Sequence, residues 1–243
     1  LPPGDIIVLS FSDSDLSAVA AASSSWSGLS RPSTPSLGTD SVQDMDARHK
    51  GEHDGGGAAF TLRLVPLRRC KHPLSIDLLI EKTLSRSRFV LLRCLGGLDS
   101  WRYGIEQVAA ACRQNGVALA VLPGDDREDE RLAGHGTVPP AFAGALLGYF
   151  HAGGGAENMR RLLGRIEGYL EAQRDTSDVA PAPLPPLFAL GSDAAPLTWR
   201  AALAALPAET PLVPVLVYRS GVTAGDTAMV EAIAAALAAR GLS

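Results

Sequence analysis

The residues best suited to bind a ligand or take part in chemistry follow the third of several short apolar runs in this 243-residue chain. Gly96 and Gly97 come directly after that run, and polar and aromatic side chains then lead into a helical pattern. Ligands of open α/β sheets bind beyond the carboxyl ends of parallel strands, and a helix N-terminus favours anions. A flat ring or an anion could therefore lie beside Trp101, Arg102 and Tyr103. The candidate substrate-binding residues are Gly96, Gly97, Ser100, Trp101, Arg102, Tyr103 and Glu106.

A purely structural interpretation of this stretch has more support from the residue types. Asp99 or Ser100 is a suitable N-cap for a helix over residues 101–115, and the aromatic side chains would then pack against a neighbouring domain. Glu106 lies one turn into that helix, where it could face a cleft or only water. The glycines come without a GxGxxG pattern or a P-loop lysine, which argues against a nucleotide-binding loop.

Two cysteines and a histidine form a weak candidate for a metal site. Cys70 and His72 follow the second apolar run, and Cys94 ends the third. Because the carboxyl ends of parallel strands share one edge of a sheet, these three side chains could converge on a soft metal ion. The sequence spacing does not require this convergence, and a cysteine on an apolar strand is more often a small core residue.

Two acidic groups have alternative interpretations of the same kind. The first group, the acidic run after the fourth apolar segment, could bind a hard cation or do acid–base work, although capping of a helix N-terminus explains it better. The second group, in the polar stretch between the first and second apolar runs, could hold a divalent ion weakly, although a solvated loop explains it better. The first group is Asp125, Asp126, Glu128, Asp129 and Glu130, and the second is His49, His53, Asp44, Asp46, Glu52 and Asp54. No nucleophile–base pair or HExxH motif is present, so the catalytic residues stay unknown.

Composition narrows the classes of function. The net charge of −4 and the scattered basic residues argue against a nucleic-acid-binding surface. Three cysteines without CxxC spacing argue against a disulfide framework and favour a reducing cytoplasm. We expect no membrane span, because no run of about 18 apolar residues occurs. The first residues do not form a secretory signal.

Apolar runs and helical patterns alternate along the first half of the chain, which is typical of a doubly wound parallel sheet of the flavodoxin-like kind. Residues 74, 78 and 79 supply the apolar face of the second expected helix, and Gly116 is placed to end the third. We expect about four strands, over residues 5–10, 61–67, 88–95 and 117–122, and helices over residues 12–22, 73–84 and 101–115.

The rest of the chain divides into a helical region, a connector and a second unit. Helices are expected over residues 126–132, 140–151 and 156–172, the last with a buried stripe of Met159, Leu162, Leu163, Ile166 and Leu170. Residues 27–59 are too polar to pack and should form a long insertion. The predicted domains are residues 1–172, a Pro-rich connector over residues 173–211, and residues 212–243, a strand and an Ala-rich helix that would begin a second, truncated α/β domain.

Several motifs, taken in their order and spacing, resemble the large-subunit family of aerobic cobaltochelatase and magnesium chelatase, with the closer likeness to the cobalt branch. The resemblance covers nearly the whole chain except the polar insertion, and residues 101–107 carry most of it. The matching stretches are residues 3–10, 71–77, 95–97, 101–107, 122–126, 153–158, 218–220 and 225–227.

The resemblance implies the N-terminal portion of an ATP-dependent ligase of cobalamin biosynthesis. In this family the large subunit holds hydrogenobyrinic acid a,c-diamide and receives cobalt(II), while separate AAA+-type subunits hydrolyse ATP with Mg²⁺. The expected partners are these ATPase subunits, the tetrapyrrole and the remainder of the large subunit. Because the family's large subunit is several times longer than this chain, we expect the isolated segment to be inactive.

A non-enzymatic receiver-type module is the alternative hypothesis. Asp13 and Asp15 follow the first expected strand, where a receiver domain binds its cation. Only an analogy at the level of the fold supports this hypothesis, and no lysine stands at a suitable place after the last strand.

Overall fold

The computed structural model describes residues 4–24, 60–190 without 126, 128 and 186, and 196–243 without 208 and 209. The polar insertion predicted over residues 27–59, with its histidines, lies outside the described residues. Asp126 and Glu128 of the acidic run also lie outside them.

Four parallel strands form the central sheet, which confirms the predicted fold class. They are β1 (Ile6–Ser10), β2 (Leu62–Pro66), β3 (Phe89–Cys94) and β4 (Ala118–Pro123), in the order β2-β1-β3-β4. Every residue of β1 and β3 is buried, as expected for central strands covered on both faces. The connection from β1 runs to one side and the connection to β3 runs to the other, so the strand order reverses between these two strands.

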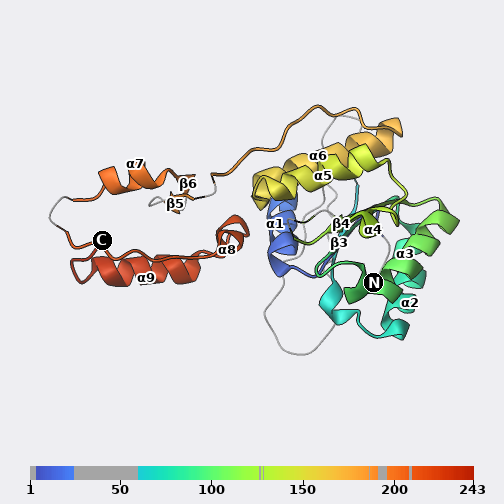
Figure 1. The fold of residues 1–243 in the computed structure, drawn as a ribbon, viewed down its shortest axis with the longest axis horizontal. Coiled ribbons are helices and arrows are strands. Elements are labelled where there is room, and N and C mark those ends of the chain that lie inside the picture. Colours follow the sequence, from blue (N-terminus) through green and yellow to red (C-terminus); the bar gives the residue numbers. More distant parts are fainter. Residues whose placement is uncertain are drawn as a thin grey trace.

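Helices cover both faces of the sheet, and the alternation of side chains along the strands divides the core into two layers (Figure 1). Ile6, Val8 and Phe89 point to the layer of α1 (Asp13–Ser24), α5 (Pro140–His151) and α6 (Gly155–Ala172). Ile7, Leu9 and Val90 point to the layer of α2 (Pro73–Lys82) and α3 (Arg102–Asn115). The stripe predicted on α6 is buried throughout. Short helical turns link these elements: η1 (Leu67–Arg69), η2 (Leu84–Arg86), η3 (Leu98–Ser100) and α4 (Glu130–Ala133).

Local sequence signals predict most helix ends, but one predicted cap and one predicted apolar face need correction. Gly116 ends α3 in the left-handed conformation, as predicted. Neither Asp99 nor Ser100 caps α3, because the η3 turn comes first and Trp101 occupies the cap position. The predicted apolar face of α2 is wrong for Leu74, which is 60% exposed, and for Leu78, because Ile76 and Leu79 point to the core instead.

The chain leaves the sheet through an extended segment, residues 173–185, which we call the strap. Tyr149 Oη donates to Val179 O (2.6 Å), Arg161 Nη1 donates to Ala180 O (2.7 Å) and Leu184 N donates to Ala152 O (3.0 Å). The strap is therefore fixed along α5 and α6 rather than hanging free.

The described part of residues 187–243 forms an arm that extends to one side of the sheet domain (Figure 1). It contains β5 (Ala189–Leu190), β6 (Pro196–Leu197), α7 (Trp199–Ala204), α8 (Arg219–Thr223) and α9 (Ala228–Ala238). None of its described residues is buried. The strand predicted over residues 212–218 is wrong, because these residues join no sheet. Val213 N donates to Ser243 O at the chain end (2.6 Å), and Ser243 N donates to Pro211 O just before the stretch (3.0 Å). A strand needs a second strand beside it for a ladder of backbone hydrogen bonds, and the described chain places no strand beside this stretch.

None of the helices in the described ranges is long and apolar enough to cross a membrane.

Candidate functional site

An arginine lies inside the otherwise apolar strand β3, and its surroundings define the candidate site. Arg93 is only 6% exposed, and a buried charge requires a partner. Its Nε lies 3.2 Å from Asp15 Oδ2, and its Nη2 donates to Gly124 O (2.8 Å). The guanidinium group also stacks over the ring of Phe150, with its carbon 3.9 Å from the ring centroid.

Asp15 comes from the first turn of α1, directly after β1. Its Oδ2 accepts a hydrogen bond from Ser10 Oγ (2.9 Å), and its backbone N–H donates to Ser12 Oγ (3.2 Å). Burial raises the pKa of the Asp15 carboxyl, while the charge of Arg93 and the hydroxyl groups of Ser10 and Ser12 act to lower it. The pair thus joins the ends of β1 and β3 at the point where the strand order reverses, which is where open α/β sheets bind ligands.

A turn of three glycines forms the next wall. Gly153, Gly154 and Gly155 all have positive φ, at 113°, 64° and 82°, so side chains other than glycine would be strained there. The turn joins α5 to α6, and no side chain caps α6 at Gly154. The first amides of this 18-residue helix therefore have no partner within the helix. Asn158 holds the turn in place by donating from Nδ2 to Gly154 O (3.0 Å).

The arm closes the site. Helix α8 contacts α1 and α6, and a Cβ at Gly155 would lie 3.5 Å from Cβ of Thr223. Together these elements enclose a cavity of about 320 Å³, which we call the switch-point cavity. Its charged side chains are Asp15, Arg93 and Arg219, and its hydroxyl groups are those of Ser12, Ser14, Tyr218, Ser220 and Thr223.

The charge of the switch-point cavity is not balanced. Asp15 is the one carboxylate among its lining residues, and Arg93 already neutralises it. Arg219, half-buried at the start of α8, has no ion-pair partner in the part of the chain that the structure describes. An arginine, hydroxyl groups and helix amides are donors that suit an oxyanion rather than a metal ion.

Trp101, a predicted substrate-binding residue, has a structural role. It is 6% exposed, its Nε1 donates to Cys70 O (2.9 Å), and its ring meets Phe11 edge-on at 5.9 Å between centroids. Gly104 has to be glycine, because a Cβ there would lie 2.2 Å from the indole ring. These contacts give Trp101 a structural role, and its contact with a ligand stays a prediction.

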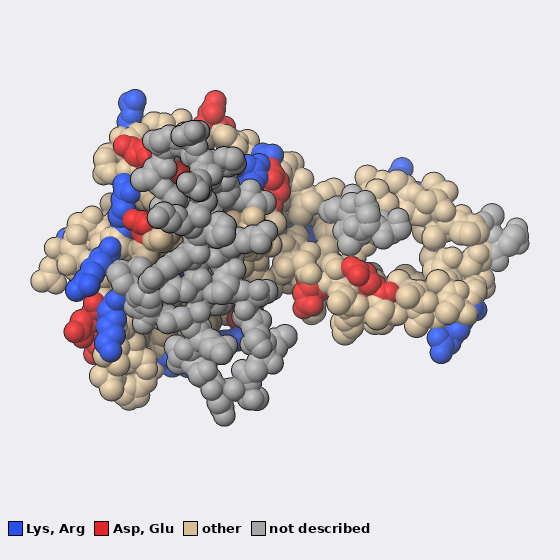
Figure 2. Space-filling model, turned by 180° about the vertical axis from the view of Figure 1, so that it is seen from behind, with Lys and Arg blue, Asp and Glu red and all other residues tan. Residues whose placement is uncertain are grey.

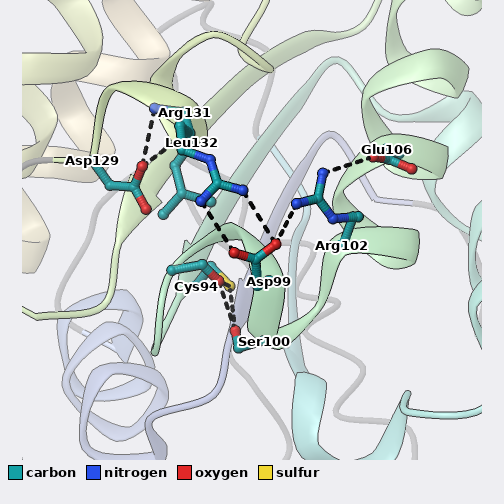
Figure 3. A network of polar contacts seen from close by, with 9 residues as sticks. Cys94, Asp99, Ser100, Arg102, Glu106, Asp129, Arg131 and Leu132 are labelled. Atoms are coloured by element: carbon teal, nitrogen blue, oxygen red, sulfur yellow. Dashed lines mark hydrogen bonds and ion pairs between the residues drawn. The ribbon is translucent and has the colours of Figure 1, made fainter.

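We call residues 96–103 the glycine-pair loop, and its exposed charged members belong to a network centred on Asp99 (Figure 3). Asp99 accepts hydrogen bonds from Arg102 and from Arg131 Nη1 (3.1 Å), and these bonds lower the pKa of its carboxyl. Arg102 also pairs with Glu106 (3.6 Å). The positive charge that the sequence offered to a ligand is therefore shared with two carboxylates.

The remaining loop residues have contacts of their own. Tyr103 Oη donates to Asp77 Oδ1 (2.9 Å), and Ser100 Oγ donates to Leu95 O and Gly97 O, both at 2.8 Å. Gly96 and Gly97 line a second cavity of about 470 Å³, whose other walls carry side chains of both charges. Substrate binding by this loop stays a prediction.

The three proposed metal ligands do not form a group. Among the described residues no three His, Cys, Asp or Glu side chains come together as a metal site. His72 instead caps α2, where its Nδ1 accepts from Leu74 N (3.2 Å). Cys94 is buried with its Sγ 3.4 Å from Ser100 Oγ, and burial raises the pKa of the Cys70 thiol.

The acidic groups have structural partners as well. Asp129 Oδ1 accepts from Arg131 N (3.0 Å) and Leu132 N (3.2 Å), which confirms the capping interpretation for this residue. Asp13 pairs with Arg68, and Asp15 pairs with Arg93. Both carboxylates that the receiver hypothesis assigns to a cation are thus engaged by arginines.

Sequence reasoning missed the switch-point cavity, although two signals for it are visible in the chain. A charged residue in a buried strand, Arg93, requires a partner from another element. The three consecutive glycines before a helix are typical of a backbone turn that approaches a ligand or another segment closely. Arg219 lies more than sixty residues after the glycine turn, and nothing in the local sequence indicates that it contacts this cavity.

Comparisons with known proteins agree on one family. No protein-family model matches the chain. The aerobic cobaltochelatase subunit CobN of Sinorhizobium sp is 30% identical over 251 residues, covering 99% of this chain and 17% of the relative. CobN of Pseudomonas aeruginosa is 33% identical over 186 residues, covering 75% of this chain and 14% of the relative. The chain thus spans about one sixth of the length of these curated relatives.

A solved structure shows the same fold. The catalytic subunit of cobaltochelatase from Mycobacterium tuberculosis matches 99% of this chain and 16% of its own length, with a TM-score of 0.55 and 23% sequence identity.

Proposed function

Because the chain belongs to the CobN family of aerobic cobaltochelatase subunits, we propose that it is the N-terminal segment of a subunit that inserts cobalt(II) into a tetrapyrrole. The single observation that carries this proposal is the 30% identity with CobN over 99% of the chain. Cobalt(II) and hydrogenobyrinic acid a,c-diamide are the proposed substrates of the whole subunit. The reaction would be that of a ligase, with ATP and Mg²⁺ used by separate AAA+-type subunits.

The role proposed for these residues is to frame the substrate cleft rather than to exchange the metal. The described residues hold no group of metal ligands. A peripheral domain can still close a cleft that other domains build. The exposed Arg102, Tyr103 and Glu106 are proposed to face that cleft.

The arm supports the proposal that a second α/β domain begins within this chain. Its large apolar side chains are exposed along residues 212–217 and on α7 and α9, and the face seen in Figure 2 carries few charges. Apolar surface of this extent marks an interface. Residues 1–172 would then be the first domain, residues 173–211 the connector, and residues 212–243 the first unit of the next domain, completed by the remainder of the subunit.

A deletion and add-back experiment tests the proposed function. The complete subunit should insert cobalt in the presence of its ATPase partners, measured by the change in the absorption bands of the tetrapyrrole. The subunit without this segment should lose most of that rate, and the isolated chain should have none. Adding the chain back should restore part of the rate, and a chain with the exposed Glu171 changed to Gln should restore it equally. Cobalt insertion by the isolated chain, or an unchanged rate after the deletion, would contradict the proposal.

A further inference from the structure

We propose that the switch-point cavity binds a small oxyanion, a carboxylate or phosphate group, and that this anion fastens the arm to the α/β domain. The proposal concerns binding by the chain itself, so it does not depend on the proposed function.

The charges of the cavity favour an anion. Two arginines and one carboxylate line it, and the Asp15–Arg93 pair cancels its own charge. Arg219 adds a positive charge that no described carboxylate neutralises. An arginine binds carboxylate and phosphate through two parallel hydrogen bonds, and does so more strongly where it is partly shielded from water.

The hydrogen-bond donors of the cavity point to the same ligand. Ser14 and Ser220 line it with hydroxyl groups that have no hydrogen-bond partner among the described residues. The glycine turn brings the uncapped start of α6 to the same wall. Gly153 N and Gly154 N donate to Phe150 O (3.0 Å) and Tyr149 O (3.1 Å), so the amides open to an anion are those of the first turn of α6, from Gly155 onward. Because Gly155 has no side chain, an anion can approach these amides closely.

The bound anion would join two parts of the molecule that otherwise touch lightly. Ser14 and the glycine turn belong to the α/β domain, whereas Arg219 and Ser220 belong to the arm. No residue of α8 is buried, so its contact with α1 and α6 lacks an apolar anchor. An anion bridging Arg219 to the glycine turn would supply the missing attraction. The volume of about 320 Å³ admits a phosphate ion or one carboxylate side chain of a larger molecule.

Calorimetric titration of the chain tests the proposal with three probes: inorganic phosphate, acetate and hydrogenobyrinic acid a,c-diamide. Arg219→Ala should weaken binding of the preferred probe at least tenfold, because a charge-assisted bidentate contact is lost. Arg240→Ala, at the exposed far end of the same arm, is the matched control and should leave binding unchanged. Arg219→Gln, which keeps the length of the side chain, should weaken binding similarly and guards against unfolding of α8 by the alanine variant.

A second measurement reports the bridge. Hydrogen exchange of the amides in α8 should slow on addition of the probe in the parent chain and in Arg240→Ala, but not in either Arg219 variant. Binding of phosphate alone would identify a free phosphate group as the ligand, and tetrapyrrole binding that phosphate displaces would identify a side-chain carboxylate. The proposal is overturned if no probe binds at millimolar concentration, or if the Arg219 and Arg240 variants bind alike.

Discussion

Strand β3 and residues 212–217 are similar in sequence but differ in how far their side chains are buried. Both are short apolar runs rich in valine and leucine. Every residue of β3 is buried, whereas Leu216 in the second run is 90% exposed. β3 lies between β1 and β4 and under two layers of helices. Residues 212–217 pair with no strand, and the backbone hydrogen bond found for them within the described residues joins Val213 N to Ser243 O at the chain end.

The contrast shows that an apolar run favours burial, but that the elements packed around it determine whether it is buried. Burial of apolar surface away from water stabilises the folded state by roughly 25 cal/mol per Å². The α/β domain gains this stabilisation within its own residues. The arm gains less of it, because none of its described residues is buried. Its order therefore depends more on the strap, on its contact through α8 and on whatever covers its apolar side chains.

Truncation of one aromatic side chain in each region should give the largest difference. Phe89 is fully buried and meets the rings of Phe142 and Tyr169 edge-on at 6.2 Å. Phe89→Ala should lower the free energy of unfolding by about 3–5 kcal/mol. Trp199 in the arm is 45% exposed, and the ring contact it has among the described residues is with the guanidinium group of Arg200 at 5.1 Å. Trp199→Ala should therefore cost less than about 0.5 kcal/mol. Urea unfolding followed by circular dichroism measures both; equal costs would show that the arm is anchored as firmly as the sheet.

Loss of the buried arginine should rank second and should depend on pH. Arg93→Met leaves the carboxylate of Asp15 without its ionic partner, which should cost about 2–4 kcal/mol at neutral pH. Burial already raises the pKa of Asp15 against the effect of Arg93, and removal of that charge should raise it further. The folded variant then binds a proton more tightly than the unfolded chain does. Its deficit should therefore shrink as the pH falls from neutral through the raised pKa.

The same substitution in the arm is the control for this pH dependence. Arg240 is exposed, and its side chain donates only to Ala236 O of its own helix. Arg240→Met should change the stability little at any pH between about 4 and 8, since an exposed arginine contributes little. A deficit of Arg93→Met that stays constant as the pH falls would show that Asp15 is not the group left uncompensated.

The comparison also explains which parts of the structure the sequence could predict. All four strands of the sheet lie within about one residue of the predicted ranges, because turn residues bound each apolar run. In the folded chain each of these runs also lies beside the strands with which it pairs. Gly116 and Pro140 placed helix ends for the same local reason. The strand predicted over residues 212–218 had a similar apolar run, although Pro214 removes one backbone donor. It failed because it has no strand to pair with, and pairing is not a local property.

The candidate site was largely beyond prediction for a related reason. The glycine-pair loop was chosen from side-chain types, but Trp101 turned inward to Cys70 and Asp99 engaged the nearby arginines. The switch-point cavity instead combines Asp15, Arg93 and Arg219, which are distant in sequence. Only the fold brings these residues together, and no periodicity or spacing in the chain records that meeting.

The smallest effect, and the one that bears most directly on the arm, should come from the joint between α6 and the strap. Asn158 is 2% exposed; its Nδ2 donates to Ala182 O (2.9 Å) and its Oδ1 accepts from Ala182 N (2.7 Å). Asn158→Ala leaves both backbone groups without partners, which should cost about 1–2 kcal/mol and speed hydrogen exchange of the Ala182 amide about tenfold or more.

A second asparagine separates the joint from the helix itself. Asn115→Ala is the matched control, since Asn115 is exposed near the end of α3 and only its own helix accepts from it, at Ala111 O (2.8 Å). Both variants gain the higher helix propensity of alanine, so their difference isolates the hydrogen bonds to the strap. If Asn158→Ala also speeds exchange in α8 while Asn115→Ala does not, the strap is what holds the arm against the α/β domain. Equal exchange in α8 for the two variants would instead leave that task to the contacts around the switch-point cavity, because those are the other place where the arm meets the domain.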